Sequence, residues 1–377
     1  MSWKEVSIMT GRREFVELAN HAEANIRELC RRFDVSSRTA YKWLKRFQQQ
    51  GIEGLLDRSR QPLHSPERCG PGIEQRVLSV RDHHPVWGAR KIRARLEALG
   101  REEIPTASTI HAILKRHGRI DPAESAKHQP WQRFEYPAPN QLWQMDFKGH
   151  FALGSGQRCH PLTVLDDHSR FALCLQACRN EQTETVQQVL TGTFRRYGLP
   201  EKMLMDNGSP WGDDWEHPYT PLTVWLLRLG TGLIHARPLH PETNGKEERF
   251  HRTLKAELLQ GRIYSDFDRM QQSFDDWRQI YNHERPHQAL NMGVPARRYQ
   301  VSPRVFPEVL PPIEYAPSDQ VRNVQQNGWI AFQGKKFRIS KAFRGYPVAL
   351  RATAQDGHWE VYFCTHKINQ IDLTSDA

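Results

Sequence analysis

Apolar positions between residues 26 and 49 recur at intervals of three and four, the spacing that predicts amphipathic helices. Two such stripes are separated by residues 34–37, whose sequence Asp-Val-Ser-Ser offers short side-chain oxygens to cap the helix that follows. A helix, a tight turn and a second helix form a helix-turn-helix, whose second helix enters the major groove of DNA. The stripes are Ile26, Leu29 and Phe33, then Ala40, Leu44 and Phe47.

The outer face of the second of these helices is basic and carries a tyrosine. Such side chains can contact phosphates and read base edges. The alternative is a small helical bundle that merely has a basic surface. The candidate DNA-binding residues on this face are Arg38, Tyr41, Lys42, Lys45 and Arg46.

A similar pattern follows between residues 73 and 117, where three helix-sized segments occur in succession. Gly100 ends the second segment, and Pro105 with Thr106 begins the third. Arg90 and Lys91 belong to the basic flank of the second segment and are further candidates for DNA binding. We therefore expect all-α tandem helix-turn-helix modules at 1–60 and 73–118, followed by a linker at 119–139 that holds four prolines.

From Leu142 onward, short apolar runs of strand length replace the helical stripes. Three strands in succession, then a helix closed by Gly198, two more strands and a helix that begins near Gly245, predict an α/β domain at 140–300. In such a domain a mixed sheet is flanked by helices. The expected strands are 142–149, 160–167, 170–178, 201–206 and 233–236, and the first helix is 183–198.

The last 60 residues alternate apolar and polar positions between Asn-Gly, Gln-Gly and Asp-Gly turns. This pattern predicts a small β-barrel at 318–377. Such a module can contact DNA or a neighbouring protomer, or it can serve packing alone.

Composition narrows the possible classes of protein. A chain of 377 residues with 25% charged and 38% apolar residues is long enough for two or three domains and is not typical of a disordered protein. No apolar run approaches the roughly 18 residues of a membrane helix, and the first residues lack a signal-peptide pattern. We expect a cytoplasmic protein without a membrane partner, whose six cysteines are thiols.

The positive charge is concentrated in the first third of the chain. Residues 1–133 hold 25 Lys and Arg against 16 Asp and Glu, whereas residues 134–377 hold 28 against 27. A basic segment joined to a near-neutral body is typical of a protein that binds a polyanion with one part and does other work with the rest. A solvated cationic surface is the alternative.

Two aspartates occupy notable places in the predicted sheet. Asp146 lies inside an apolar strand, and Asp206 ends a later strand before a glycine-containing turn. Carboxylates on adjacent strands, completed by one from a helix, can hold two divalent metals about 4 Å apart for phosphoryl transfer. Mg²⁺ suits such oxygen ligands. Taken alone, either aspartate is more readily explained as a turn residue at a strand end or as an ion-pair partner.

Four motifs give the chain a specific resemblance. WQMDFKG, MDNGSPW, NGKEERFHRTL and YNHERPHQAL occur in the order found in bacterial insertion-sequence transposases with a retroviral-integrase-type catalytic core. The resemblance spans about residues 20–300. It implies an RNase H-like fold, an Asp-Asp-Glu triad that binds two Mg²⁺ or Mn²⁺ ions, and cleavage of transposon ends followed by transfer of their 3′-hydroxyls into target DNA. Asp146 and Asp206 match the first two members of the triad.

The resemblance leaves three candidates for the third acid. The family's usual number of residues between the second aspartate and the glutamate indicates Glu242, which lies in a turn-like stretch. Glu248 instead matches the glutamate of the NGKxERFHRTL pattern. We favour Glu248, with a short insertion at 211–219 explaining the longer spacing. Glu247 is the rival: it lies on the apolar side of the helix, where the family usually has an apolar residue. Arg252 and Lys255 share the face of Glu248 and are candidates for phosphate binding.

Other features are interpreted as structural. Cys174 and Cys178 lie on one apolar strand and are expected to be buried thiols rather than zinc ligands. Asp166 and Asp167 are expected to cap a turn. No glycine-rich nucleotide loop is present, so we expect no dependence on ATP.

Two other functions compete with the transposase. One is a sequence-specific DNA-binding regulator with an inactive integrase-like core. The other is a recombinase with a covalent nucleophile, but none of the 18 histidines has an arginine three residues later, as the tyrosine recombinases require. A transposase must hold two DNA ends together, so we expect a homodimer or larger oligomer on double-stranded DNA, associated with the bacterial nucleoid.

Overall fold

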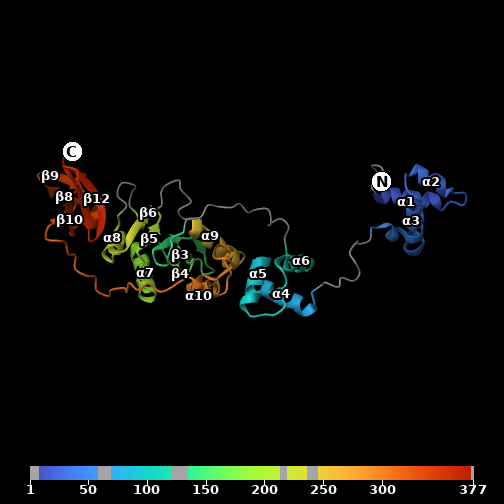
Figure 1. Cartoon of the computed structure of the whole chain (residues 1–377), viewed down its shortest axis with the longest axis horizontal. Helices are drawn as coiled ribbons and strands as arrows, with labels where there is room; N and C mark the ends of the chain where they lie inside the picture. Colours follow the sequence, from blue (N-terminus) through green and yellow to red (C-terminus); the bar gives the residue numbers. More distant parts are fainter. Residues whose placement is uncertain (1–7, 58–68, 121–134, 213–218, 236–244, 375–377) are drawn as a thin grey trace. The chain divides into compact units, whose positions relative to one another are not determined.

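The computed structural model describes residues 8–57, 69–120, 135–212, 219–235 and 245–374. The chain divides into two compact units, Met1–Arg68 and Cys69–Ala377, whose elements are labelled in Figure 1. None of the described helices combines the length and the apolar character that crossing a membrane requires.

The first unit is a bundle of three helices, α1 (Ile8–Ala19), α2 (Ile26–Arg32) and α3 (Ser37–Gln50), followed by the short 3-10 helix η1 (Gly51–Leu55). Side chains cap both later helices as the sequence predicts for α3: Asn25 accepts from two amides of α2, and Ser36 accepts from the amide of Thr39. The predicted helix-turn-helix is therefore present between residues 26 and 50. Its buried core consists of Phe15, Val16, Cys30, Ala40, Trp43, Leu44 and Leu55.

Trp43 is the main core residue that the predicted stripe of α3 omits. Its ring is buried, and the Arg12 guanidinium carbon lies 3.8 Å from the ring centroid. Arg12 also donates to the carbonyl of Leu55 and to Asp57, both at 2.8 Å. These contacts of Arg12 join α1 to α3 and to the last residues of the bundle, 55–57.

The second unit begins with three further helices, α4 (Pro71–His83), α5 (Ala89–Ala98) and α6 (Ala107–Arg116), close to the predicted segments. Gly100 adopts φ +63° after α5, a left-handed conformation that favours glycine, and Thr106 caps α6. The helices share a buried core, against which Ile280 of the later helix α10 also packs. Arg95 forms an ion pair with Glu284 at 2.5 Å.

The central domain contains a mixed six-stranded sheet. Its strands are β1 (Leu142–Phe147), β2 (Phe151–Ala152), β3 (Arg158–Asp166), β4 (Ala172–Cys178), β5 (Lys202–Met205) and β6 (Gly232–His235). β1 is central, antiparallel to β3 and parallel to β5, while β6 continues parallel to β5 and β4 pairs with the far side of β3. The predicted meander and mixed sheet are confirmed.

Helices cover both faces of this sheet (Figure 1). One face packs against α7 (Thr183–Tyr197) and α8 (Pro221–Arg228), through Trp143 and Met145 of β1. The other packs against α9 (Gly245–Leu254), its π-helical continuation η4 (Lys255–Leu259) and α10 (Phe267–His283). Because side chains alternate along a strand, Gln144 and Asp146 of β1 face the α9 side.

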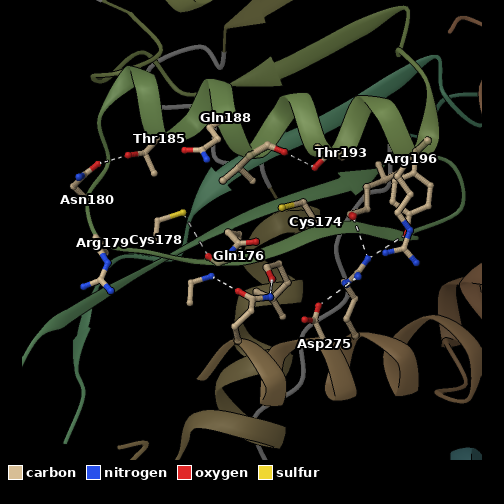
Figure 2. A pocket seen from close by; sticks show the side chains of 18 residues that line it. Cys174, Gln176, Cys178, Arg179, Asn180, Thr185, Gln188, Thr193, Arg196 and Asp275 are labelled. Carbon is tan, nitrogen blue, oxygen red and sulfur yellow. Dashed lines mark hydrogen bonds and ion pairs between the residues drawn. The ribbon is translucent and has the colours of Figure 1, made fainter. Parts of the chain in front are cut away.

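The edge strand β4 is already hydrogen bonded to side chains of α10. Asn282 accepts from the amide of Ala172 and donates to its carbonyl, and Gln271 accepts from the amide of Ala177. A groove of about 620 Å³ lies beside this edge. Among the side chains that line it, Figure 2 labels Thr185, Gln188 and Thr193 of α7 and Asp275 of α10. None of the predicted catalytic acids lines it.

The C-terminal domain is a four-stranded antiparallel sheet and a separate hairpin that share one core, which includes Val224 and Leu227 of α8. The predicted closed barrel is not confirmed: in the described residues the sheet runs β12–β11–β10–β7, and no ladder joins β7 back to β12. The strands are β7 (Gln320–Asn323), β8 (Trp329–Phe332), β9 (Lys335–Arg338), β10 (Pro347–Ala352), β11 (His358–Phe363) and β12 (His366–Asp372).

Candidate active site

The parallel pairing of β1 with β5 brings the two predicted aspartates together. Leu142 pairs with Lys202, and Gln144 with Leu204. The same offset, carried two residues further, places Asp206 beside Asp146 at the carboxyl ends of the two strands. Neighbouring strands lie about 5 Å apart, so two carboxylates at this point share one small region.

The turn after β5 is tightly closed around Asp206. The carboxylate accepts from the amide of Asn207 at 2.8 Å, and the amides of Trp211 and Gly212 donate to the carbonyl of Gly208. A Cβ on Gly212 would lie 2.6 Å from the carbonyl oxygen of Asn207, so the close approach requires glycine. The buried Trp211 ring stacks on Phe147, which follows Asp146 in the chain. The motif MDNGSPW thus fixes Asp206 next to the end of β1.

Asp146 is partly buried among other acids. The pKa of Asp146 is raised to about 6, mainly by burial and also by the charges of Asp206, Glu181 and Glu248, while a hydrogen bond from the amide of Phe147 opposes the rise. Glu181, which also pairs with His160 at 2.8 Å, was not among the predicted residues. Three other carboxylates therefore act on Asp146, and a bound cation would relieve this unfavourable charge.

The two adjacent glutamates of helix α9 differ in burial. Glu247 is 1% exposed, whereas Glu248 is exposed on the open side of the helix, where its charge acts on Asp146. The third candidate, Glu242, lies outside the described residues. The charge of Glu248 therefore acts on Asp146 from the open side of the helix, whereas Glu247 is buried, where the charge of Asp146 also acts on it.

A buried network surrounds Glu247. Thr163, which pairs with Asp146 across β1 and β3, has its hydroxyl 2.9 Å from the carbonyl of Asp146, 3.0 Å from Glu247 Oε2 and 2.9 Å from His251 Nε2. A hydroxyl has one proton, so when it donates to the carbonyl, its other two partners must donate to it. Burial raises the pKa of Glu247 and lowers that of His251 to about 3, so a neutral carboxyl and a neutral imidazole fit these roles.

A second buried network holds Lys246. Its ammonium pairs with Asp167, whose side chain is fully buried at the turn after β3. Asp167 also accepts from Gln144 Nε2 at 2.7 Å and from the amide of Tyr136 at 2.8 Å. The prediction that Asp166 caps this turn is confirmed, because it accepts from the amide and hydroxyl of Ser169. The additional role of Asp167 toward α9 was not predicted, because Lys246 is 79 residues away in sequence.

Lys148, Arg252 and Lys255 have no carboxylate partner among the described residues. Within the described residues, no Asp or Glu oxygen lies within 4 Å of the side-chain nitrogens of Lys148, Arg252 or Lys255, and the last two are exposed. Burial lowers the pKa of Lys148, and the nearby charge of Lys255 lowers it further. Unpaired cations beside a group of acids are suited to the phosphates of a bound nucleic acid.

The acids have the chemistry of a site for hard divalent cations. Asp146, Asp206 and Glu248 offer only oxygen, and Asp206 and Glu248 are open to solvent. In the part of the chain that the structure describes, no three His, Cys, Asp or Glu side chains lie close enough together to hold a metal ion. The fit to Mg²⁺ or Mn²⁺ is one of donor chemistry alone, because all three side chains offer only oxygen.

The candidate DNA-binding residues of the helical modules differ in exposure. Arg38, Tyr41, Lys42, Lys45 and Arg90 are exposed, as direct DNA contact requires. Arg46 is half-buried, with its guanidinium 4.9 Å from the Trp43 ring centroid. Lys91 is also half-buried, and burial, followed by the charge of Arg285, lowers its pKa to about 7. Lys91 therefore faces the catalytic domain, in contrast to Arg90.

Cys174 and Cys178, which were expected to be buried thiols, lie in the interior of the protein. Cys174 and Cys178 are buried, and burial raises their pKa values to about 11 and about 12. Such thiols are poor sources of the thiolate that zinc requires.

Models of known domains match most of the chain. A helix-turn-helix domain matches residues 12–62, and a homeodomain-like domain matches residues 39–114. Integrase core domains match residues 137–241 and 229–295. The C-terminal domain of IS481 family transposases matches residues 319–377.

Curated proteins of two insertion elements are similar in sequence. An uncharacterized 31.7 kDa protein of insertion element IS407 from Burkholderia multivorans is 29% identical over 249 residues, covering 64% of this chain and 87% of the relative. An uncharacterized 39.2 kDa protein of IS476 from Xanthomonas euvesicatoria is 25% identical over 238 residues, covering 62% of this chain and 66% of the relative.

Solved structures of retroviral proteins are also similar. A chain of the simian T-cell lymphotropic virus intasome, in complex with PP2A regulatory subunit B56 gamma, is 16% identical with a TM-score of 0.37, covering 78% of this chain and 95% of its own. The HTLV-2 integrase catalytic core domain in complex with magnesium is 12% identical with a TM-score of 0.32, covering 44% and 99%. The domain matches and the insertion-element relatives confirm the predicted resemblance: this chain resembles an insertion-sequence transposase with a retroviral-integrase-type core.

Proposed function

We propose that the protein binds the terminal inverted repeats of an insertion sequence, cleaves phosphodiester bonds at its ends and transfers the freed 3′-hydroxyls into target DNA. The observation that carries this proposal is the meeting of Asp146 and Asp206 at adjacent ends of β1 and β5, with the charge of Glu248 acting on Asp146 from α9. Phosphoryl transfer needs such a concentration of carboxylates at one point.

Asp146, Asp206 and Glu248 would hold two Mg²⁺ or Mn²⁺ ions. When bound, the two ions neutralise charge on the attacked phosphate and lower the pKa of the attacking water or 3′-hydroxyl. The contribution of the protein is to keep the three carboxylates in place and to position the DNA strand. Lys148, Arg252 and Lys255 are the cations that we assign to the phosphates beside the cleaved bond. No protein group forms a covalent bond to DNA, and no ATP is consumed.

The helical modules supply recognition of the transposon ends in this proposal. α3 presents Arg38, Tyr41, Lys42 and Lys45 to one part of the repeat, and α5 presents Arg90 to another. Tandem domains read a longer sequence than one domain can, which raises specificity. Because two ends must react together, the protein acts on DNA as a homodimer or a larger oligomer.

The proposal is tested with labelled end DNA, in the presence of Mg²⁺ or of EDTA. We expect metal-dependent release of a 3′-hydroxyl end by the wild type. Asp146→Asn and Asp206→Asn should bind the ends normally and lose cleavage at least 100-fold, because an amide is a poorer ligand for a hard cation. Binding without any cleavage by the wild type would instead support the DNA-binding regulator, and a covalent protein–DNA adduct would support the recombinase.

The third acid is tested by comparing Gln variants at equal end binding. Glu248→Gln should abolish cleavage, whereas Glu247→Gln, which keeps a donor for Thr163, should retain most of it. Glu242→Gln serves as the third arm of the comparison. An active Glu248→Gln beside an inactive Glu242→Gln would overturn the assignment of Glu248.

A further inference from the structure

The first turn of α9 carries the proposed third ligand directly after two residues that are held in the interior. Lys246 pairs with the buried Asp167, and Glu247 contacts Thr163 of β3. Successive residues of an α-helix point about 100° apart. With both preceding side chains directed inward, Glu248 is left on the outward side, where it is exposed.

The rotation of this turn about the helix axis decides which glutamate reaches the acidic site. A rotation by one residue would bring Glu247 outward and Glu248 inward. The apolar stripe of α9 does not decide this alone within the first turn, because its buried members, Phe250 and Leu254, begin only at the second turn. The direction of Glu248 therefore depends on the two polar contacts of the first turn, Lys246 with Asp167 and Glu247 with Thr163, which we call its anchors.

Of the two anchors, Lys246–Asp167 is the stronger. Asp167 is fully buried and bonded by three donors, from α9, from β1 and from the segment before β1: Lys246, Gln144 and Tyr136. Loss of one partner of a buried ion pair leaves an uncompensated charge, whereas replacing both partners by uncharged residues can be neutral for stability. This asymmetry allows the contribution of the pair to stability to be separated from its contribution to geometry.

We propose that the Lys246–Asp167 ion pair is a positioning clamp that fixes the rotation of the first turn of α9, so that Glu248 rather than Glu247 faces Asp206 and Asp146. The clamp acts through Glu248, and its consequence for metal binding rests on the proposed function of that residue. Lys246 itself touches neither metal nor DNA in this inference.

The clamp is tested first by amide hydrogen exchange in the metal-free full-length protein. Lys246→Met should accelerate exchange at least tenfold at residues 249–252, whose amides bond to the carbonyls of the first turn of α9, with little change in α10. Arg285→Met is the matched control, because Arg285 forms another buried ion pair on the same side of the sheet, with Glu257 at 2.8 Å. This control should lower the melting temperature comparably without accelerating exchange at residues 249–252. Unchanged exchange in Lys246→Met overturns the clamp, whether or not the protein is a transposase.

The second measurement is Mn²⁺ binding to the same full-length variants, by calorimetry. Lys246→Met should weaken binding at least tenfold, whereas Arg285→Met should bind as the wild type does. The double variant Lys246→Met/Asp167→Asn removes both charges, so we expect it to recover stability but not Mn²⁺ affinity. Recovery of both would reduce the pair to a stability role and overturn the positioning proposal. If Asp146→Asn leaves Mn²⁺ binding unchanged, the proposed function fails, and the clamp is still judged by the exchange experiment.

Discussion

At the scale of single residues, the ionised form of Asp146 is disfavoured in the folded protein. Asp146 lies where burial and three neighbouring acids raise its pKa to about 6 from an ordinary 3.8. The folded protein therefore holds a proton on Asp146 at pH values where the unfolded chain has released it. The stability that this residue contributes is complete below pH 4 and is lost as the pH rises through 6.

This linkage predicts the behaviour of Asp146→Asn in EDTA. The variant should be more stable than the wild type at pH 7.5, by about 1–3 kcal/mol, because it lacks the buried charge. Its advantage should shrink at pH 4.5, where Asp146 of the folded wild type is protonated. Thermal unfolding at both pH values measures the difference, with the exposed Asp268→Asn as control. An advantage that grows toward acid pH would contradict the raised pKa.

The sequence predicted Asp146 and Asp206 because a strand pattern and a turn motif are local signals. It also placed Glu247 on the apolar side of its helix, which the burial of Glu247 confirms. The partners of α9 could not be predicted in the same way. Thr163 lies 84 residues from Glu247 in the chain, so only the pairing of β1 with β3 and the packing of α9 bring them together.

At the scale of elements, helix α3 combines a buried face centred on Trp43 with an outer face of cations. We expect Arg38→Ala and Lys42→Ala each to weaken end binding. Each should also reduce the slope of log Kd against log salt concentration by about one unit, because binding with one phosphate contact fewer releases one counterion fewer. Titrations between 50 and 200 mM salt measure this slope. Gln48→Ala, an exposed change on the same helix, should leave it unaltered. Equal slopes in all three variants would place α3 away from DNA.

Some elements could not be predicted from the sequence pattern. Helix α8 was missed because it is buried between the core domain and the C-terminal sheet, with Leu222 and Leu226 in one core and Val224 and Leu227 in the other. A helix that is apolar on all sides shows no stripe. The expected barrel failed for a similar reason: alternation predicts strands, but closure depends on which strands pair across the module.

At the scale of the whole molecule, the chain divides into two compact units at residue 68. The second helical module belongs to the same compact unit as the catalytic domain, and Arg95 pairs with Glu284 of that domain. The first helical bundle is a unit by itself. The boundary at residue 68 is therefore the place to separate DNA recognition from the catalytic body.

Removal of residues 1–68 should leave the rest of the protein folded, because no described core of the second unit includes a residue of the first. We expect the melting temperature of the remainder to change by only a few degrees. Binding to end DNA should weaken at least tenfold, while binding to unrelated DNA changes less. Circular dichroism and gel-shift titrations measure these two effects. End-specific binding that survives the deletion would assign recognition to α4–α6 alone.

The helix that covers the edge of β4 is synthesised much later than β4 itself. Ala172 and its partner Asn282 are 110 residues apart. At about 5–20 residues per second, the ribosome makes β4 roughly 5–20 seconds before the helix that covers its edge. During that interval the nascent chain carries an open strand, the kind of edge that recruits other extended chains. In the folded protein Asn282 and Gln271 occupy this edge, so β4 is most open to such pairing before α10 emerges.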